Sequence, residues 1–262
     1  MNFHNQKIYC NPAIVNYYQS LSELQPAEII LLEKLRPQLS QFKMLDIGIG
    51  GGRTTTHFAP LVGDYYGIDY AGEMINACQK KFIRTLPKAN FQILDARDLS
   101  QFADNSFDLI LFSFNGIDYV EHGDRLKILS EVARVGKSNA YFAFSSHNLQ
   151  AMIRQFSWQT HLSFNPFASY INLFKWGVLR LVNLAITPQK LKNSNYYLIR
   201  EESHAFRLQT YYIKPEVQIA QLATNFQDIE LYSWQSGSEI TMREDAALNS
   251  NFWLYYFCRV KK

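Results

Sequence analysis

The stretch MLDIGIGGG, residues 44–52, decides the fold of this chain, because it places four of the 12 glycines directly behind a short apolar run. Glycine weakens both strands and helices, so a cluster of this density requires a structural reason. The two common reasons are a tight turn and a backbone that another group approaches closely. We therefore expect a buried strand at KMLDIG (43–48), a glycine-rich loop, and a helix over residues 53–62.

Strand and helix patterns alternate from this stretch to residue 148. Further strands are expected at residues 65–70, 90–95, 106–114 and 140–148, and helices at 71–86 and 124–136. This alternation predicts a parallel sheet that is covered by helices on both faces. After a helix over 214–226, the last two strands (229–234 and 251–260) have no helix between them, so they should pair antiparallel.

The predicted fold is an α/β protein with a doubly wound, mostly parallel seven-stranded sheet and a C-terminal antiparallel hairpin. Its Rossmann-like core would comprise residues 41–148 and 206–262. Residues 1–40 would form a helical cap, in which Pro26 is well placed to begin a helix. Residues 149–205 show helical and polar stretches without a clear strand, and we expect them to form an inserted helical lid.

The composition argues against several classes of function. A net charge of +3, with no run of Lys or Arg longer than two residues, gives little support for nucleic-acid binding. Cys10, Cys78 and Cys258 lack the C-x-x-C spacing of a disulfide framework or zinc site, and no other metal-ligand spacing occurs, so no metal is expected. The first ten residues lack the apolar core of a secretion signal, which favours the cytoplasm.

The longest apolar region covers residues 167–186 and contains Asn172, Lys175, Arg180 and Asn183. These polar groups would be costly in a membrane-spanning helix. We therefore expect an amphipathic helix that is buried on one side. Docking to a membrane surface is the less favoured alternative, and membrane association is not expected.

Three acidic residues, Asp46, Asp69 and Asp95, stand at the ends of three successive predicted strands. A carboxylate at the end of the second strand can accept hydrogen bonds from both ribose hydroxyls, and one after the third strand can accept from an adenine amino group. The glycines alone would also fit a nicotinamide-dependent enzyme, whereas the absence of G-K-[ST] excludes a phosphate-binding P-loop. The three acids together suggest an adenosine ligand without a phosphate. The alternative for Asp69 and Asp95 is that they cap the following helices.

In order and spacing, four motifs resemble those of class I S-adenosylmethionine-dependent methyltransferases. They are MLDIGIGGGRTT (44–55), YYGIDYAGEMI (65–75), ILDARDL (93–99) and FDLILFSFNGIDYV (107–120). The terminal strands resemble the antiparallel hairpin of that family, and the resemblance covers roughly residues 40–148 and 206–262. It implies S-adenosylmethionine as the cofactor and methyl transfer as the reaction.

The resemblance also implies roles for individual residues. Asp46 would orient the methionine amino group above the backbone of Gly48, Gly50 and Gly52. Asp69 would bind the ribose, Tyr70 or Met74 would pack on the adenine, and Asp95 with Ala96 would meet its edge. The segment from Ser113 to Asn115 would line the methionine side. Tyr17 or Tyr18 would close over the cofactor or simply pack the N-terminal helix, and Arg53 would hold the methionine carboxylate or lie in solvent.

Methyl transfer depends mainly on alignment and exclusion of water, and a general base helps when the acceptor is a hydroxyl or a protonated amine. The candidate bases are His147, Asp118 and His122, with His204 and Asn148 as further contacts; a structural role is the alternative for the histidines. The segment SFNGIDY (113–119) lacks the prolines of the N-P-P-Y motif that is typical of base-amine methylation in nucleic acids.

The inserted segment is rich in Phe, Trp and Leu and would cover a small, partly hydrophobic acceptor, or form a dimer interface or a plain structural cap. We therefore predict an enzyme, monomeric or homodimeric, that methylates an oxygen or nitrogen of a small molecule or short peptide, such as a secondary metabolite. The alternative is a non-catalytic adenosyl-ligand binding protein of the same fold.

Overall fold

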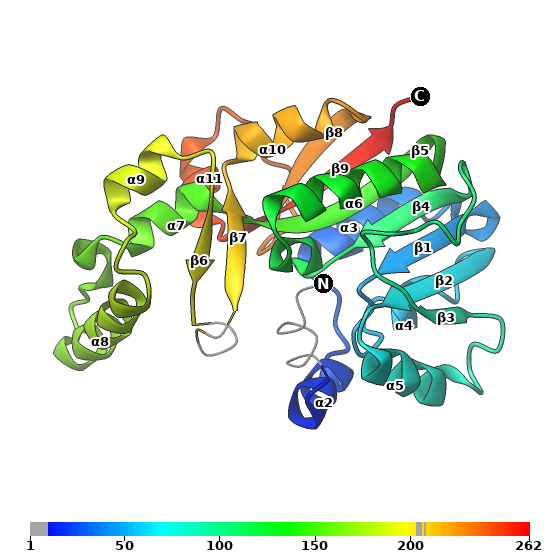
Figure 1. Ribbon diagram of the computed structural model, residues 1–262, viewed down its shortest axis with the longest axis horizontal. Helices are drawn as coiled ribbons and strands as arrows, with labels where there is room; N and C mark the ends of the chain where they lie inside the picture. The colour runs from blue at the N-terminus through cyan, green and yellow to red at the C-terminus, as the bar shows by residue number, and fades with distance from the viewer. Residues whose placement is uncertain (1–9, 203–205, 207) are drawn as a thin grey trace.

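The computed structural model describes residues 10–202, 206 and 208–262 (Figure 1). The strands in this part of the chain are β1 (Lys43–Ile47), β2 (Asp64–Asp69), β3 (Asn90–Ile93), β4 (Phe107–Phe112), β5 (Gly136–Asn148), β6 (Tyr196–Arg200), β7 (Gln209–Ile213), β8 (Phe226–Ser233) and β9 (Trp253–Val260). They form one nine-stranded sheet in the order β3-β2-β1-β4-β5-β7-β6, with β9 paired to β5 and β8 paired to β9.

The strands from β1 to β5 are parallel, as the alternation of strands and helices predicts. β9 pairs antiparallel with both β5 and β8, so the prediction of a C-terminal antiparallel hairpin is confirmed. The strands follow from β1 through β2 to β3 on one side and from β4 to β5 on the other. The strand order therefore reverses between β1 and β4, and this is the switch point where ligands bind in doubly wound sheets.

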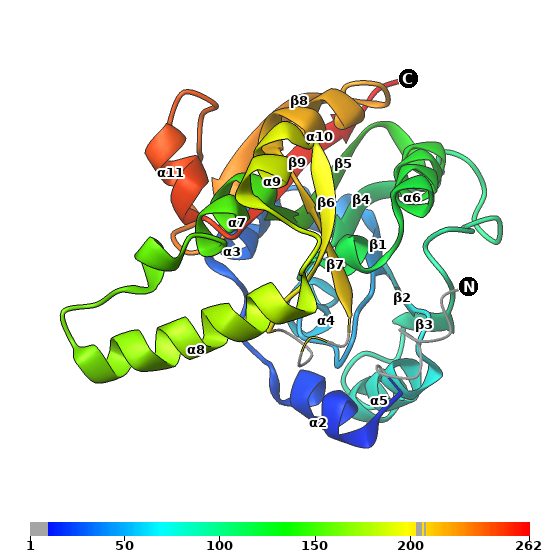
Figure 2. The same cartoon turned by 60° about the vertical axis from the view of Figure 1, so that its left-hand side comes forward.

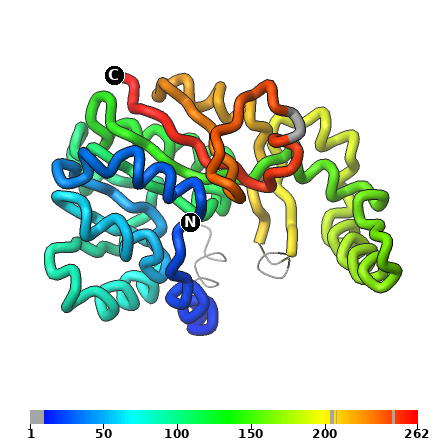
Figure 3. Tube along the Cα trace, turned by 180° about the vertical axis from the view of Figure 1, so that it is seen from behind, coloured from blue at the N-terminus to red at the C-terminus, as the bar shows by residue number. Residues whose placement is uncertain are grey.

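The helices of the described residues cover both faces of this sheet or lie beyond its edge. They are α2 (Pro12–Ser20), α3 (Pro26–Leu35), α4 (Thr55–Phe58), α5 (Gly72–Phe82), α6 (His122–Val135), α7 (Leu149–Gln155), α8 (Pro166–Val182), α9 (Pro188–Asn193), α10 (Pro215–Leu222) and α11 (Asp245–Ser250), with short 3-10 helices η1 (Leu39–Gln41), η2 (Gly116–Tyr119) and η3 (Trp158–His161). Figure 1 shows α6 and α10 in front of the sheet, and Figure 3, seen from behind, shows α3 across the other face.

The apolar run of β4 explains how one strand supports both layers. Ile110 and Phe112 belong to the core on the α6 side, whereas Leu109 and Leu111 belong to the core on the α3 side. Side chains of a strand alternate between its two faces, so a strand that is covered on both sides must be apolar throughout.

The prediction that residues 149–205 contain no strand is wrong at β6. This strand pairs antiparallel with β7, and β7 extends the sheet by pairing parallel with the end of β5 at His147 and Asn148. The segment also has its own apolar cluster, which includes Met152, Phe156 and Leu179.

Helix α8 corresponds to the predicted amphipathic helix, but the prediction that its apolar side is buried is wrong. Asn165 caps the helix by accepting hydrogen bonds from Phe167 N and Ala168 N, and Pro166 occupies its first turn. Leu179 is its only buried side chain in the described structure. Figure 2 shows α8 at the outer edge of the molecule.

None of the described helices combines the length and the apolar character needed to cross a bilayer.

Candidate functional site

The glycine-rich loop after β1 makes a turn that only glycine adopts without strain. Gly48, Gly50 and Gly52 all have positive φ angles, between +52° and +81°. Gly51 meets a different constraint, because a Cβ atom there would lie 2.4 Å from the backbone of Tyr18 in α2. Both common reasons for a glycine cluster therefore apply, and the group that approaches Gly51 closely is the chain itself.

A cavity of about 440 Å³ opens beside this loop, at the carboxyl ends of the parallel strands. Its size lies within the usual range for small-molecule sites. The predicted site residues that line it are Tyr18, Gly48, Gly50, Asp69, Tyr70, Met74, Asp95, Ala96, Ser113 and Phe114. The fold therefore brings these ten residues to one cavity at the switch point of the sheet.

Asp69, at the end of β2, is buried on the cavity wall. Its Oδ1 accepts a hydrogen bond from Ala71 N at 2.9 Å, and its Oδ2 accepts one from Gly50 N at 3.0 Å. Burial raises the pKa of this carboxyl to about 6, despite these two hydrogen bonds. Each carboxylate oxygen can accept a second hydrogen bond, so Asp69 can hold the loop and a ligand at once.

Asp95 follows β3 and faces the same cavity. Burial raises the pKa of its carboxyl, but hydrogen bonds from the side chain and backbone of Arg97 outweigh burial and lower the pKa overall. Arg97 Nη1 also donates to Asp124 of α6 at 2.7 Å. Asp95, Arg97 and Asp124 thus form a polar part of the cavity wall. Arg97 stands in the motif ILDARDL, two residues after Asp95, and this spacing is the sequence signal for the ion pair.

Asp46 in β1 and Gly52 of the loop do not line the cavity. Asp46 Oδ2 accepts hydrogen bonds from Thr54 Oγ1 at 2.6 Å and Tyr65 OH at 2.7 Å. Burial raises the pKa of Asp46 to about 7. This carboxyl ties the start of α4 to β2, and its direct contact with a cofactor stays a prediction.

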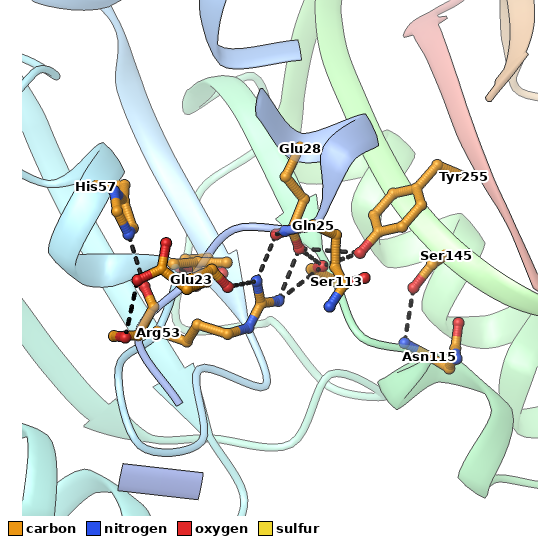
Figure 4. A network of polar contacts seen from close by, with 12 residues as sticks. Glu23, Gln25, Glu28, Arg53, His57, Ser113, Asn115, Ser145 and Tyr255 are labelled. Atoms are coloured by element: carbon orange, nitrogen blue, oxygen red, sulfur yellow. Dashed lines mark hydrogen bonds and ion pairs between the residues drawn. The ribbon is translucent and has the colours of Figure 1, made fainter. Parts of the chain in front are cut away.

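Arg53 requires a correction, because its guanidinium is neither in solvent nor on the cavity wall. It forms a buried ion pair with Glu28 of α3, in which Nη2 donates to Oε1 at 2.7 Å (Figure 4). Ser113 and Tyr255 also donate hydrogen bonds to Glu28 Oε1. Glu28 neutralises the guanidinium, so Arg53 stabilises the wall behind Ser113, and its contact with the methionine carboxylate stays a prediction.

Asn115, His147 and Asp118 form a buried group behind the cavity wall. His147 Nδ1 lies 2.8 Å from Asp118 Oδ2, and His147 Nε2 lies 3.5 Å from Asn115 Nδ2. Asp118 is fully buried and also pairs with Arg125, so it is not a base that meets a substrate. Its carboxylate instead orients the ring of His147 with the proton on Nδ1, which leaves the Nε2 lone pair facing Asn115.

His122 lies away from this group. Its ring stacks on Tyr196 of β6 at 4.2 Å between centroids, and its Nδ1 lies 2.7 Å from Tyr211 OH. It therefore packs the start of α6 against the β6–β7 hairpin, which corresponds to the structural alternative for this residue. His204 lies outside the described residues.

Several residues of the cavity wall were not predicted from the sequence. They are Ile47, Leu94, Arg97, Phe112, Gly116, Tyr119, Val120, Glu121, Asp124 and Ile128. None of the described residues of the 149–202 segment lines the cavity, so closure by this segment stays a prediction.

Among the described residues, no group of three His, Cys, Asp or Glu side chains could hold a metal ion.

Comparisons with known proteins agree with this architecture. The model of a family described as "Methyltransferase domain" matches residues 44–139. The chain is 24% identical over 132 residues to a ubiquinone biosynthesis O-methyltransferase of Hydrogenovibrio crunogenus, which covers 50% of this chain and 53% of that protein. It is 32% identical over 112 residues to an uncharacterized methyltransferase of Bacillus subtilis, covering 41% of this chain and 42% of that protein. The chain thus spans about half the length of the curated relatives it matches.

A solved structure extends the similarity to the whole fold. The 1,6-didemethyltoxoflavin-N1-methyltransferase of Burkholderia thailandensis, solved with 1,6-didemethyltoxoflavin and S-adenosylhomocysteine, has a TM-score of 0.58 at 13% identity. The alignment covers 99% of this chain and 88% of that one. The motifs, the sheet order and the family match agree: residues 44–139 match a methyltransferase domain, and the chain as a whole has the fold of the class I S-adenosylmethionine-dependent methyltransferases.

Proposed function

We propose that this protein transfers a methyl group from S-adenosylmethionine to an oxygen or nitrogen atom of a small, partly hydrophobic molecule. The observation that carries the proposal is the cavity at the switch point of the sheet, whose wall holds Asp69 after β2 and Asp95 after β3. These carboxylates are suited to the ribose hydroxyls and the adenine edge of an adenosyl ligand. The three free cysteines fit a reducing cytoplasm, where we expect the protein to act.

The residues present fit the proposed cofactor. Asp69 keeps lone pairs for the ribose, while Met74 and Ala96 offer apolar surface for the adenine. Ser113 lies at the other end of the wall, beside the glycine loop that would support the methionine part. Tyr18 of the proposed N-terminal cap also lines the cavity. When bound, S-adenosylmethionine would supply an electrophilic methyl group on its sulfonium.

The affinity for S-adenosylhomocysteine should decrease as the pH falls through about 6. The carboxyl pKa of Asp69 is raised to about 6 by burial, so below this pH the group is protonated and accepts fewer hydrogen bonds. A ligand that needs the ionised form then competes with a proton, and the affinity is greatest above pH 6. Calorimetric titrations across this range test the prediction. Asp69→Asn should remove the pH dependence, and an unchanged pH dependence in that variant would assign it to another group.

We further propose that His147 acts as the general base for the acceptor. Asn115 Oδ1 is buried and has no hydrogen-bond partner among the described residues, and the neighbours of Asn115, Phe114 and Gly116, line the cavity. An acceptor hydroxyl or amine that donates to Asn115 Oδ1 would lie close to His147 Nε2. Asp118 would stabilise the positive charge that His147 gains when it takes the proton.

The cavity wall on this side favours a planar, apolar acceptor. Phe112, Phe114 and Tyr119 provide aromatic surface near the methionine end. The names of the relatives point to ring compounds: one is a ubiquinone biosynthesis O-methyltransferase and another methylates a nitrogen of 1,6-didemethyltoxoflavin. We therefore favour a hydroxyl or nitrogen on an aromatic ring, as in natural-product tailoring, over a short peptide.

Incubation with S-adenosylmethionine labelled in its methyl group tests the proposed function even while the acceptor is unidentified. The purified protein is mixed with a small-molecule extract of the cells from which the gene derives. Label should appear in a small, chromatographically retained compound and should fall strongly with the Asp69→Ala variant. Binding of the cofactor without labelling of any compound would instead favour a non-catalytic binding protein.

A further inference from the structure

One side of α8 presents large apolar side chains to solvent. Phe167, Tyr170, Ile171, Phe174 and Leu181 are 71%, 69%, 39%, 66% and 68% exposed, and we call these five residues the α8 stripe. Their spacing of three, four and seven residues places them on one side of the helix. An exposed apolar face of this length marks a surface that binds a partner or a membrane.

Exposed apolar side chains also occur next to both ends of α8. Phe164 and Leu162 precede α8, Leu184 follows it, and all three are exposed. Trp158 of η3 is exposed as well. Figures 1 and 2 show α8 at the outer edge of the molecule, beyond the β6–β7 hairpin. The apolar surface is therefore accessible to a large, flat partner.

The opposite side of α8 fixes the direction in which the stripe faces. Leu179 is buried in the apolar cluster of this segment, and Trp176 Nε1 donates to Phe156 O at 3.2 Å. Arg180 Nη1 donates to Ile186 O at 2.6 Å and lies over the ring of Phe156. These contacts hold α8 to the end of α7 at Phe156 and to Ile186, which follows α8. The stripe therefore cannot turn inward unless these contacts break.

The segment that carries the stripe is mainly positive in charge, although Lys175 of α8 pairs with Glu202. No Asp or Glu occurs between Glu131 and Glu201. Residues 149–202 contain six basic and two acidic residues, a net charge of +4, although the whole chain has a net charge of only +3. Arg154, Lys190 and Lys192 are exposed. An anionic partner is therefore complementary to this end of the molecule.

We propose that the α8 stripe docks on the surface of a bilayer that contains anionic phospholipids, with α8 lying in the plane of the interface. A helix with Phe, Tyr and Leu on one side and basic residues nearby is typical of this mode of binding. The 17-residue helix contains Asn172, Lys175 and Arg180, which suits the interface rather than the hydrocarbon interior. A second copy of the chain is less complementary, because a symmetric contact would bring two segments of +4 together.

This inference does not depend on the proposed methyl transfer, because the α8 stripe and the cavity wall share no residue. It departs from the sequence-based expectation that membrane association would not occur. The docked position would bring a partly hydrophobic acceptor that resides in the bilayer close to the protein.

Flotation of the full-length protein with vesicles tests the docking. The protein should float with vesicles of phosphatidylcholine and phosphatidylglycerol, and the bound fraction should fall in high salt. It should bind vesicles of phosphatidylcholine alone more weakly. The double variant Phe167→Ser/Phe174→Ser should reduce the partition coefficient at least about tenfold, since each exposed phenyl ring would otherwise be buried in the interface.

A matched control replaces two exposed isoleucines outside the stripe. Ile83→Ser/Ile93→Ser removes apolar side chains that are 71% and 59% exposed, and it should leave vesicle binding unchanged. Urea unfolding curves and S-adenosylhomocysteine affinity should be the same for both double variants, which shows that the fold is intact.

Three results would overturn the proposal. One is the absence of flotation with either kind of vesicle. Another is undiminished flotation of the Phe167→Ser/Phe174→Ser variant. The third is a dimer in light scattering that this variant converts to a monomer while no vesicle binding occurs, because the stripe would then belong to a second copy of the chain.

Discussion

Replacing Glu28 by alanine should lower the free energy of unfolding by about 3–5 kcal/mol, because the substitution leaves the buried guanidinium of Arg53 without its counter-ion. Glu28 is 0% exposed and Arg53 is 7% exposed, so water cannot compensate for the loss. Ser113 and Tyr255 would lose the same acceptor. Urea denaturation followed by fluorescence measures the effect.

Two controls separate the loss of the buried pair from a general effect of substitution. The exposed pair Arg36–Glu33 lies on the same helix and its C-cap, and Glu33→Ala should leave the unfolding midpoint nearly unchanged. The double variant Glu28→Gln/Arg53→Met removes both charges and should recover part of the stability. If Glu28→Ala and Glu33→Ala were equally stable, the buried network would not hold α3 to the cavity wall.

Replacing His147 by alanine should lower kcat by about 10²–10⁴-fold and leave the affinity for S-adenosylhomocysteine nearly unchanged. The Nε2 atom of His147 lies beside Asn115, just behind the cavity wall, and Asp118 fixes the ring from the other side. Removal of the imidazole therefore removes the proposed base without touching Asp69 or Asp95. Single-turnover assays with S-adenosylmethionine labelled in its methyl group, together with calorimetry, separate the two effects.

A second histidine, His122, serves as the control. It packs on Tyr196 and Tyr211 away from the cavity, so His122→Ala should retain the kcat of the wild type. Single-turnover methyl transfer should therefore be slow in the His147 variant and as fast as in the wild type in the His122 variant. Equal single-turnover rates in all three proteins would assign His147 a structural role only.

The sequence predicts the core of this fold well because the patterns that indicate each strand and helix lie within that element. The strand-and-helix alternation of β1 to β5 follows from apolar runs and turn residues within each element. Asp69 and Asp95 could be placed at one edge because the carboxyl ends of parallel strands meet there. The glycine cluster marked the loop, although the contact of Gly51 with Tyr18 depends on the placement of α2.

The parts that could not be predicted depend on contacts between distant segments. Strand β6 has five residues and becomes recognisable only through its pairing with β7. Arg53 and Glu28 are 25 positions apart, and nothing in either local sequence indicates that they meet. The pattern of α8 predicts an apolar side, but whether that side is buried depends on where the helix packs.

Titration of the protein with S-adenosylhomocysteine tests the central claim most directly, with NADH as the competing ligand. We expect saturable binding of S-adenosylhomocysteine and little binding of NADH. In Asp69→Ala the free energy of binding S-adenosylhomocysteine should weaken by about 1–3 kcal/mol, because hydrogen bonds to a charged group are lost. Asp64→Ala, at the exposed opposite end of β2, should bind like the wild type. Failure of the wild type to bind S-adenosylhomocysteine, or equal affinity in Asp69→Ala, would contradict the assignment of this cavity.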